Sequence, residues 1–244
     1  MANVLGEAGG FQNQRAVQRR LRLILAVFAA YAAIALFLGF LAGKGSLLWI
    51  AAAIALILAG LPLVRWLSDR QLRLAGIDEA GASGELQVLH LLRSLPDDYT
   101  VVCDLEFPDS YGNIDHLVIG PKGIFAIDAK NWRGVVAADG KGELLCNGGS
   151  TDKPHVRRFL HRVMDLKDRI TVLTKLDPYV QAVFAFPRAR VEAKWGSTGS
   201  VHCIRAEQLE EYITTGKGGR PLSKHDAAHI VSAVEALRNM PLSP

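Results

Sequence analysis

The chain has 244 residues, half of them hydrophobic, and a net charge of +4. Residues 1–74 carry eight basic and two acidic side chains, whereas residues 75–244 carry 20 basic and 22 acidic ones. Because the excess of positive charge belongs to the N-terminal part, it does not indicate nucleic-acid binding by the remainder. The three cysteines form no CxxC or Cys/His zinc spacing, which predicts buried free thiols in a reducing compartment.

Two uncharged runs follow a tail, residues 1–22, that we expect to be loose or weakly helical. Leu23–Ala42 contains 20 residues without charge, and Ser46–Val64 is a second such run. At about 1.5 Å per residue, the first run spans roughly the 30 Å hydrocarbon core of a membrane. A cleaved signal peptide has a shorter apolar run and no second run directly after it. Residues 23–66 are therefore predicted to form a transmembrane hairpin in the lipid bilayer.

Basic residues flank this hairpin and are scarce at its tip. Four arginines precede the first run and three follow the second, whereas Lys44 alone lies between the runs. The positive-inside bias predicts a multi-pass protein of the cell (inner) membrane, with both termini and the following domain in the cytoplasm. Neither run holds an ionisable residue, so a transport path has no support. Recurrent alanines permit helix packing within the hairpin or between copies in a homo-oligomer.

Short elements alternate after a linker predicted at residues 67–83. A leucine-rich helix is expected from Glu85 to Pro96, followed by a strand over Thr100–Phe107. Beyond the hairpin described next, we expect strands at 135–138, 144–146, 180–186 and 201–204, and helices at 154–176, 207–213 and 223–239. We assign residues 84–215 to one domain and residues 216–244 to a C-terminal helical extension.

The segment NIDHLVIGPKGIFAIDAK, which begins at residue 113, contains the residues best suited to chemistry. Two apolar runs flank Gly-Pro-Lys-Gly, which predicts a hairpin turn. If Ile119 faces Ile124 across this turn, Asp115 lies opposite Asp128, with the Cβ atoms about 4.5–5.5 Å apart. Residues two apart share a face of a strand, so Lys130 joins the two carboxylates.

Opposed carboxylates on an apolar sheet are unfavourable unless a positive charge lies between them. Two oxygen ligands at this separation suit a hard cation such as magnesium, and a neighbouring lysine can hold a phosphate or an attacking water. The alternative is that Asp115 caps a strand end in solvent while Asp128 pairs with Lys130. The hairpin alone leaves both interpretations open.

The order from residue 85 onward is helix, three strands, helix, strand, and it resembles the PD-(D/E)XK nuclease superfamily. Within it, roughly residues 79–215 resemble the nuclease-related domain (NERD) family. The matching motifs are Gly84-Glu85, Ile114-Asp115-His116, Gly123-Ile124-Phe125, Asp128-Ala129-Lys130 and Asn131-Trp132-x-Gly134. The resemblance implies an α/β fold, a restriction-endonuclease-like mixed sheet flanked by helices with an αβββαβ core, here preceded by two transmembrane helices.

The resemblance also implies roles for individual residues. Asp115 and Asp128 would bind Mg²⁺ or Mn²⁺ together with the carbonyl of Ala129. Lys130 would orient the attacking water and stabilise charge on the phosphate, and Glu85 would complete the acidic cluster. Phosphodiester hydrolysis needs a metal-activated water and a cation against the developing charge. Taken alone, Glu85 is explained as a helix N-terminal carboxylate favoured by the helix dipole.

The helix after the hairpin carries a basic cluster. Lys153, Arg157 and Arg158 are predicted to contact the phosphate backbone of DNA or RNA. A solvated face with ion pairs, in which Arg158 and Arg162 pair with Asp165, is an equally good explanation. His116 alternates away from the carboxylate face, which predicts a packing or supporting role. Trp132 follows the strand end, where it stacks a base or simply covers the sheet.

Two departures from the family pattern bear on function. Asp128 stands where the family usually has Glu, and Lys153-Pro154 with Arg157 stands where Asn-Pro and Gln are usual. The first functional hypothesis is a membrane-anchored, metal-dependent nuclease. The second is a catalytically degenerate, membrane-tethered module that binds nucleic acid or acts as a scaffold. A third is a module that binds protein partners near the membrane.

Overall fold

The computed structural model describes residues 1–6, 80–108, 112–193 and 200–240, together with isolated residues between 21 and 66. Residues 1–11 and 81–244 belong to one compact unit, and residues 12–80 form another. The predicted transmembrane hairpin therefore lies largely outside the described residues. In the part of the chain that is described, no helix is long and apolar enough to span a membrane.

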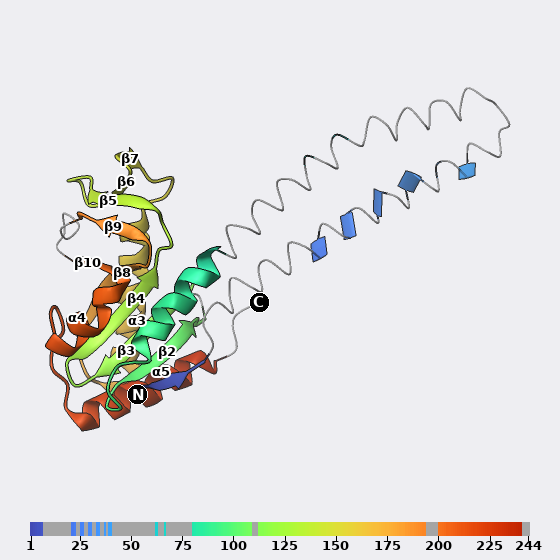
Figure 1. The fold of residues 1–244 in the computed structure, drawn as a ribbon. Coiled ribbons are helices and arrows are strands. Elements are labelled where there is room, and N and C mark those ends of the chain that lie inside the picture. Colours follow the sequence, from blue (N-terminus) through green and yellow to red (C-terminus); the bar gives the residue numbers. More distant parts are fainter. Residues whose placement is uncertain are drawn as a thin grey trace. The chain divides into compact units, whose positions relative to one another are not determined.

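A six-stranded mixed sheet forms the centre of the first unit, in the order β1-β2-β3-β4-β8-β10 (Figure 1). Its strands are β1 (Asn3–Leu5), β2 (Thr100–Leu105), β3 (Ile114–Gly120), β4 (Gly123–Ala129), β8 (Val180–Phe186) and β10 (Val201–Arg205). β2, β3 and β4 pair antiparallel, whereas β1 joins β2, β8 joins β4 and β10 joins β8 in parallel. A tight turn suffices between β3 and β4, but parallel β8 requires a crossover, which a long helix supplies.

Helices cover both faces of this sheet. On one face lie α3 (His155–Thr174) and α5 (Lys224–Arg238), which bury Leu117 and Ala126. On the other lie the helix at residues 80–92, η1 (Ala206–Gln208) and α4 (Leu209–Thr215), which bury Val118 and Phe125. Burial on both sides explains the nearly continuous apolar runs of β3 and β4. The order helix, β2, β3, β4, α3, β8 agrees with the predicted αβββαβ core.

A second, smaller sheet has the order β7-β6-β5-β9. It consists of β5 (Gly134–Ala138), β6 (Leu144–Cys146), β7 (Gly149–Ser150) and β9 (Ala189–Val191). β5 follows the end of β4 and β9 follows the end of β8, so this sheet adjoins the end of the main sheet that holds Asp128. In its β5–β6 loop, Glu143 accepts hydrogen bonds from the N–H groups of Val156 and Arg157 at 2.9 and 3.0 Å. The carboxylate thereby caps the first turn of α3.

Three elements extend beyond the bounds expected from the sequence. The helix expected from Glu85 is already formed at residue 80, so the end of the predicted linker is helical. Asn3–Leu5, within the expected loose tail, is a strand, because Val4 and Leu5 pack against the cores on opposite faces of the sheet. α5, expected to be an extension, is part of the domain core, into which it buries Ile230, Val234 and Leu237.

Candidate functional site

The β3–β4 hairpin has the predicted register. Ile119 pairs with Ile124, and the same register places Asp115 opposite Asp128 at the open end of the hairpin. The main-chain N–H of Ala129 donates a hydrogen bond to Asp115 Oδ2 at 2.7 Å. The two aspartates therefore lie at one end of the sheet, on the face that α3 covers.

Both carboxylates are buried, with 7% of Asp115 and 3% of Asp128 exposed. The alternative that Asp115 caps a strand end in solvent is therefore wrong. Asp128 does pair with Lys130, as that alternative supposed, and it forms a second ion pair with Arg162 at 2.8 Å. Two cations thus neutralise one buried aspartate.

These surroundings separate the pKa values of the two carboxyl groups. Burial, followed by the negative charges of Asp128 and Glu85, raises the pKa of Asp115 well above its usual range. Burial alone would also raise the pKa of Asp128, but the charges of Lys130 and Arg162 hold it below its usual value. One aspartate is therefore ionised, while its neighbour readily retains a proton. Such separation is common in functional sites, although structural ion-pair networks produce it as well.

Glu85 reaches the same cluster from the helix at residues 80–92. Glu85 is only 2% exposed, and its negative charge contributes to the raised pKa of Asp115. The helix dipole acts most strongly in the first turn of a helix. Because this helix is already formed at residue 80, Glu85 lies beyond its first turn. The dipole explanation of this residue is therefore wrong. A Cβ atom on Gly84 would lie 2.8 Å from Asn131 Cβ, so glycine permits the close approach of this helix to the end of β4.

His116 lies on the opposite face of β3, as strand alternation predicted. Its Nε2 lies 3.1 Å from the main-chain carbonyl oxygen of Glu85, which can only accept, so Nε2 carries the proton. Burial lowers the pKa of His116 to about 4, so the ring is neutral at pH 7. This hydrogen bond ties β3 to the helix that carries Glu85, which is a supporting role.

Arg162 is the site residue that sequence reasoning missed. Its Nη2 donates to Asp128 and its Nη1 donates to the carbonyl oxygen of Asn113 at 2.5 Å. The predicted pairing of Arg162 with Asp165 is wrong, because Asp165 pairs with Arg169 at 3.1 Å. The sequence did contain a pattern that could have pointed to Arg162. Residues 155, 158 and 162 have helical spacing and form one stripe along α3.

The three basic residues predicted to bind substrate are exposed. At 100° per residue, Arg158 lies about 40° from Arg162 around the axis of α3, whereas Arg157 lies about 140° away. Arg158 therefore lies on the same side of α3 as Arg162, and Arg157 does not. Lys153 precedes the helix, near the capped first turn. The structure brings together Glu85, Asp115, Asp128 and Lys130, but it does not bring Arg157 to them.

Trp132 follows the end of β4, close in sequence to Asp128 and Lys130. Its ring lies 5.1 Å from the His155 ring and 5.7 Å from the Phe186 ring, and the side chain packs against the core under α3. These contacts explain Trp132 by packing, so nothing assigns it to base stacking.

The oxygen donors suit magnesium, although they are few. Within the described ranges, no three His, Cys, Asp or Glu side chains are arranged to hold a metal ion. Mg²⁺, however, binds through one or two carboxylates and keeps several waters, so Asp115, Asp128 and the carbonyl of Ala129 fit its preference. Binding requires that Asp115 lose its proton. It also competes with Lys130 and Arg162 for Asp128.

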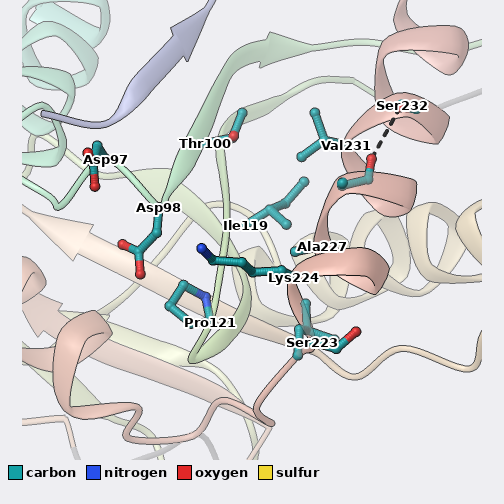
Figure 2. Close-up of a pocket in the computed structure, with 12 residues that line it drawn as sticks. Asp97, Asp98, Thr100, Ile119, Pro121, Ser223, Lys224, Ala227, Val231 and Ser232 are labelled. Carbon is teal, nitrogen blue, oxygen red and sulfur yellow. Dashed lines mark hydrogen bonds between the residues drawn. The ribbon is translucent and has the colours of Figure 1, made fainter.

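A cavity of about 580 Å³ lies at the other end of β3. Figure 2 shows the Lys224 side chain reaching from α5 toward Asp98, and Ile119 and Pro121 also line the cavity. Ile119 is four residues from Asp115, which corresponds to about 13 Å along the strand. The cavity is therefore separate from the carboxylate cluster.

Comparison with family models identifies the region that holds this cluster. Residues 80–187 match the model of NERD, the nuclease-related domain. The match includes Glu85, Asp115, Asp128 and Lys130 and ends one residue after β8. The predicted resemblance to this family is confirmed for these residues. Comparisons with curated proteins and with solved structures each found no match.

Proposed function

We propose that residues 80–187 form a nuclease that hydrolyses phosphodiester bonds of DNA or RNA with the help of Mg²⁺ or Mn²⁺. The observation that carries the proposal is the pair Asp115 and Asp128, buried at the open end of one hairpin beside Lys130. The match of this region to a nuclease-related domain supports the same reaction class.

Each residue of the cluster has a distinct role in this proposal. Asp115, Asp128 and the carbonyl of Ala129 would hold the divalent cation, which when bound would activate a water and neutralise phosphate charge. Lys130 orients the attacking water and stabilises charge that develops on the non-bridging oxygens. Glu85 adds a third carboxylate from the helix on the other face of the sheet.

Positive charge near the cluster supports a polyanionic substrate. Residues 130–162 contain seven basic and three acidic side chains, although residues 75–244 as a whole are slightly acidic. Arg158, on the site side of α3, and Lys153, near its first turn, contact the phosphate backbone in this proposal. Arg157, although also basic, contributes only at longer range because it lies on a different side of α3 from Arg162.

Membrane anchoring through residues 23–66 is part of the proposal. β1 precedes these residues and β2 follows them, yet the two strands pair in one sheet. A chain that leaves and re-enters the same domain crosses a bilayer an even number of times, which supports a hairpin rather than a single span. Together with the charge bias, this supports a cytoplasmic location for both termini and the site. The alanine-rich runs would allow hairpins of two copies to pack.

The test uses the full-length chain in neutral detergent. It is incubated with plasmid, linear and single-stranded DNA and with RNA, with Mg²⁺ or Mn²⁺ and with EDTA. Asp128→Ala and Lys130→Ala should abolish metal-dependent cleavage. Lys167→Ala and Asp177→Ala provide a matched control, because this pair is also a Lys–Asp ion pair, at 2.7 Å, but lies outside the cluster. Cleavage that survives in the site variants would refute the proposal.

A degenerate binding module remains the second candidate. It is favoured by the two ion pairs of Asp128, because Lys130 and Arg162 neutralise this aspartate without a metal. Nucleic-acid binding without cleavage, and with no Mn²⁺ bound in calorimetry, would establish this candidate instead of the nuclease.

A further inference from the structure

Arg162 joins two neighbouring strand ends of the cluster. Its Nη2 lies 2.8 Å from Asp128 Oδ2 beyond the middle of β4, and its Nη1 lies 2.5 Å from the carbonyl oxygen of Asn113, directly before β3. Only 16% of the Arg162 side chain and 4% of the Asp128 side chain are exposed. The guanidinium therefore occupies a largely desolvated position against a carboxylate proposed to hold a cation.

One nitrogen of this guanidinium makes no hydrogen bond within the described ranges. Arg162 Nε is buried and has no hydrogen-bond partner among the described residues. An arginine binds phosphate through two parallel N–H groups, and a buried donor without a partner is unfavourable. The Nε–Nη2 edge is suited to two phosphate oxygens, but Nη2 is taken by Asp128.

Electrostatic repulsion opposes simultaneous binding of Arg162 and a divalent cation to Asp128. Asp128 already faces two positive side chains, and a divalent cation on the same carboxylate would add two further positive charges beside them. Lys130 belongs to the chain segment that directly follows β4 and stays close to Asp128. Arg162 comes from α3 and has a second acceptor in Asn113, so it can release Asp128 without losing every partner.

We propose that Arg162 is an exchangeable counter-ion: it neutralises Asp128 in the metal-free protein and transfers to a phosphate oxygen of the substrate when a divalent cation takes that carboxylate. The proposal rests on the nuclease function above and deepens it. The cation and Arg162 compete for Asp128, whereas the cation and the phosphodiester favour each other through Arg162. Cation binding and substrate binding are thereby coupled.

The test measures binding rather than cleavage. Free Mn²⁺ is followed by electron paramagnetic resonance during titration of the full-length chain, without nucleic acid. A fluorescent phosphorothioate oligonucleotide that resists cleavage then reports substrate affinity by anisotropy, with Mn²⁺ present. Arg162→Met removes the charge with little change in volume. Arg169→Met is the matched control, because Arg169 pairs with Asp165 and lies 4.9 Å over Phe107, as Arg162 lies 5.4 Å over Phe159.

Opposite changes in the two affinities are expected. Arg162→Met should bind Mn²⁺ more tightly, by about tenfold, and the oligonucleotide more weakly by a similar factor. Arg169→Met should change neither. A residue that merely orients Asp128 predicts the opposite sign for Mn²⁺, because a misplaced carboxylate binds more weakly.

The outcomes separate this inference from the proposed function. Unchanged or weaker Mn²⁺ binding by Arg162→Met overturns the counter-ion role but leaves the nuclease proposal standing. Absence of Mn²⁺ binding in the wild type and both variants overturns the metal-dependent function itself, and the inference with it. If circular dichroism shows that Arg162→Met does not fold, Arg162→Lys decides. Lysine keeps the positive charge but lacks the two parallel N–H groups of the guanidinium. Weaker Mn²⁺ binding by Arg162→Lys than by the wild type would contradict the inference.

Discussion

Asp115 accepts a hydrogen bond from the main-chain N–H of Ala129, which lies on the neighbouring strand, at 2.7 Å. This bond joins the open end of the hairpin, where the strand ladder stops. The carboxyl group of Asp115 therefore has a structural role besides its proposed role in metal binding. The two roles can be separated by substitution, because the hydrogen bond requires only an acceptor oxygen whereas the cation requires a negative charge.

Asp115→Asn should retain the fold and lose Mn²⁺ binding. The amide oxygen still accepts from Ala129, and the raised pKa of Asp115 means that its charge is unfavourable in the folded state, so the free energy of unfolding at pH 7 should stay equal or rise. Asp115→Ala leaves the N–H without an acceptor and should lower that free energy by about 1–3 kcal/mol. Urea unfolding measures both. Equal stability of the two variants would contradict a structural role for the hydrogen bond between Asp115 and Ala129.

Gly84→Ala should destabilise the protein although alanine is the better helix former. The substitution gains up to about 1 kcal/mol in helix propensity, but its Cβ would lie 2.8 Å from Asn131 Cβ. The helix must then move away from the end of β4 and carry Glu85 with it. We expect a lower melting temperature and at least tenfold less metal-dependent cleavage. The exposed Ser83→Ala serves as control and should change stability by no more than about 0.5 kcal/mol.

Arg158→Ala should weaken nucleic-acid binding more than Arg157→Ala. Both arginines are exposed, but only Arg158 lies on the side of α3 that carries Arg162. Loss of one phosphate contact should reduce the slope of log K against log salt concentration by about 0.7–0.9. Anisotropy titrations at several salt concentrations, in EDTA, measure this slope. If the two variants show the same affinity and the same slope, nucleic-acid binding depends only on the net charge of α3 and not on the position of Arg158.

His116 should make the fold sensitive to moderate acid. Its pKa is lowered by burial to about 4, whereas in the unfolded chain the imidazole titrates near the ordinary histidine pKa of 6.5. Between these values the unfolded state binds more protons, so stability is complete above pH 6.5 and is lost as the pH falls toward 4. This group alone should lower the free energy of unfolding by up to about 3 kcal/mol.

The matched variant for this prediction is His116→Gln. Glutamine can still donate to the Glu85 carbonyl but does not titrate, so its stability should fall less steeply over the same pH range. Parallel curves for wild type and variant, measured by urea unfolding at each pH, would show that His116 is not the responsible group.

The sequence was sufficient for the parts of the site that depend on local rules. Strand alternation and the length of the turn determine the register of the β3–β4 hairpin, and they correctly placed Asp115 opposite Asp128. His116 was correctly assigned to the other face for the same reason. These inferences needed only residues close together in the chain.

Parts of the site that depend on distant packing could not be predicted. Arg162 had a local partner in Asp165 at helical spacing, and only the approach of α3 to the hairpin reveals that Asp128 is the nearer anion. β1 was missed because three residues carry almost no periodic signal. Its partner strand lies 97 positions later, from Asn3 to Thr100.

That separation has a consequence for the order of folding. β1 precedes β2 in the chain and can pair only after β2 has been made, when the two uncharged runs have already been completed. A contact between such distant positions closes a very long loop and forms late. The first six residues must therefore remain available while the rest of the sheet assembles. A change within Asn3–Leu5 would therefore interfere with the final step of folding rather than with the site.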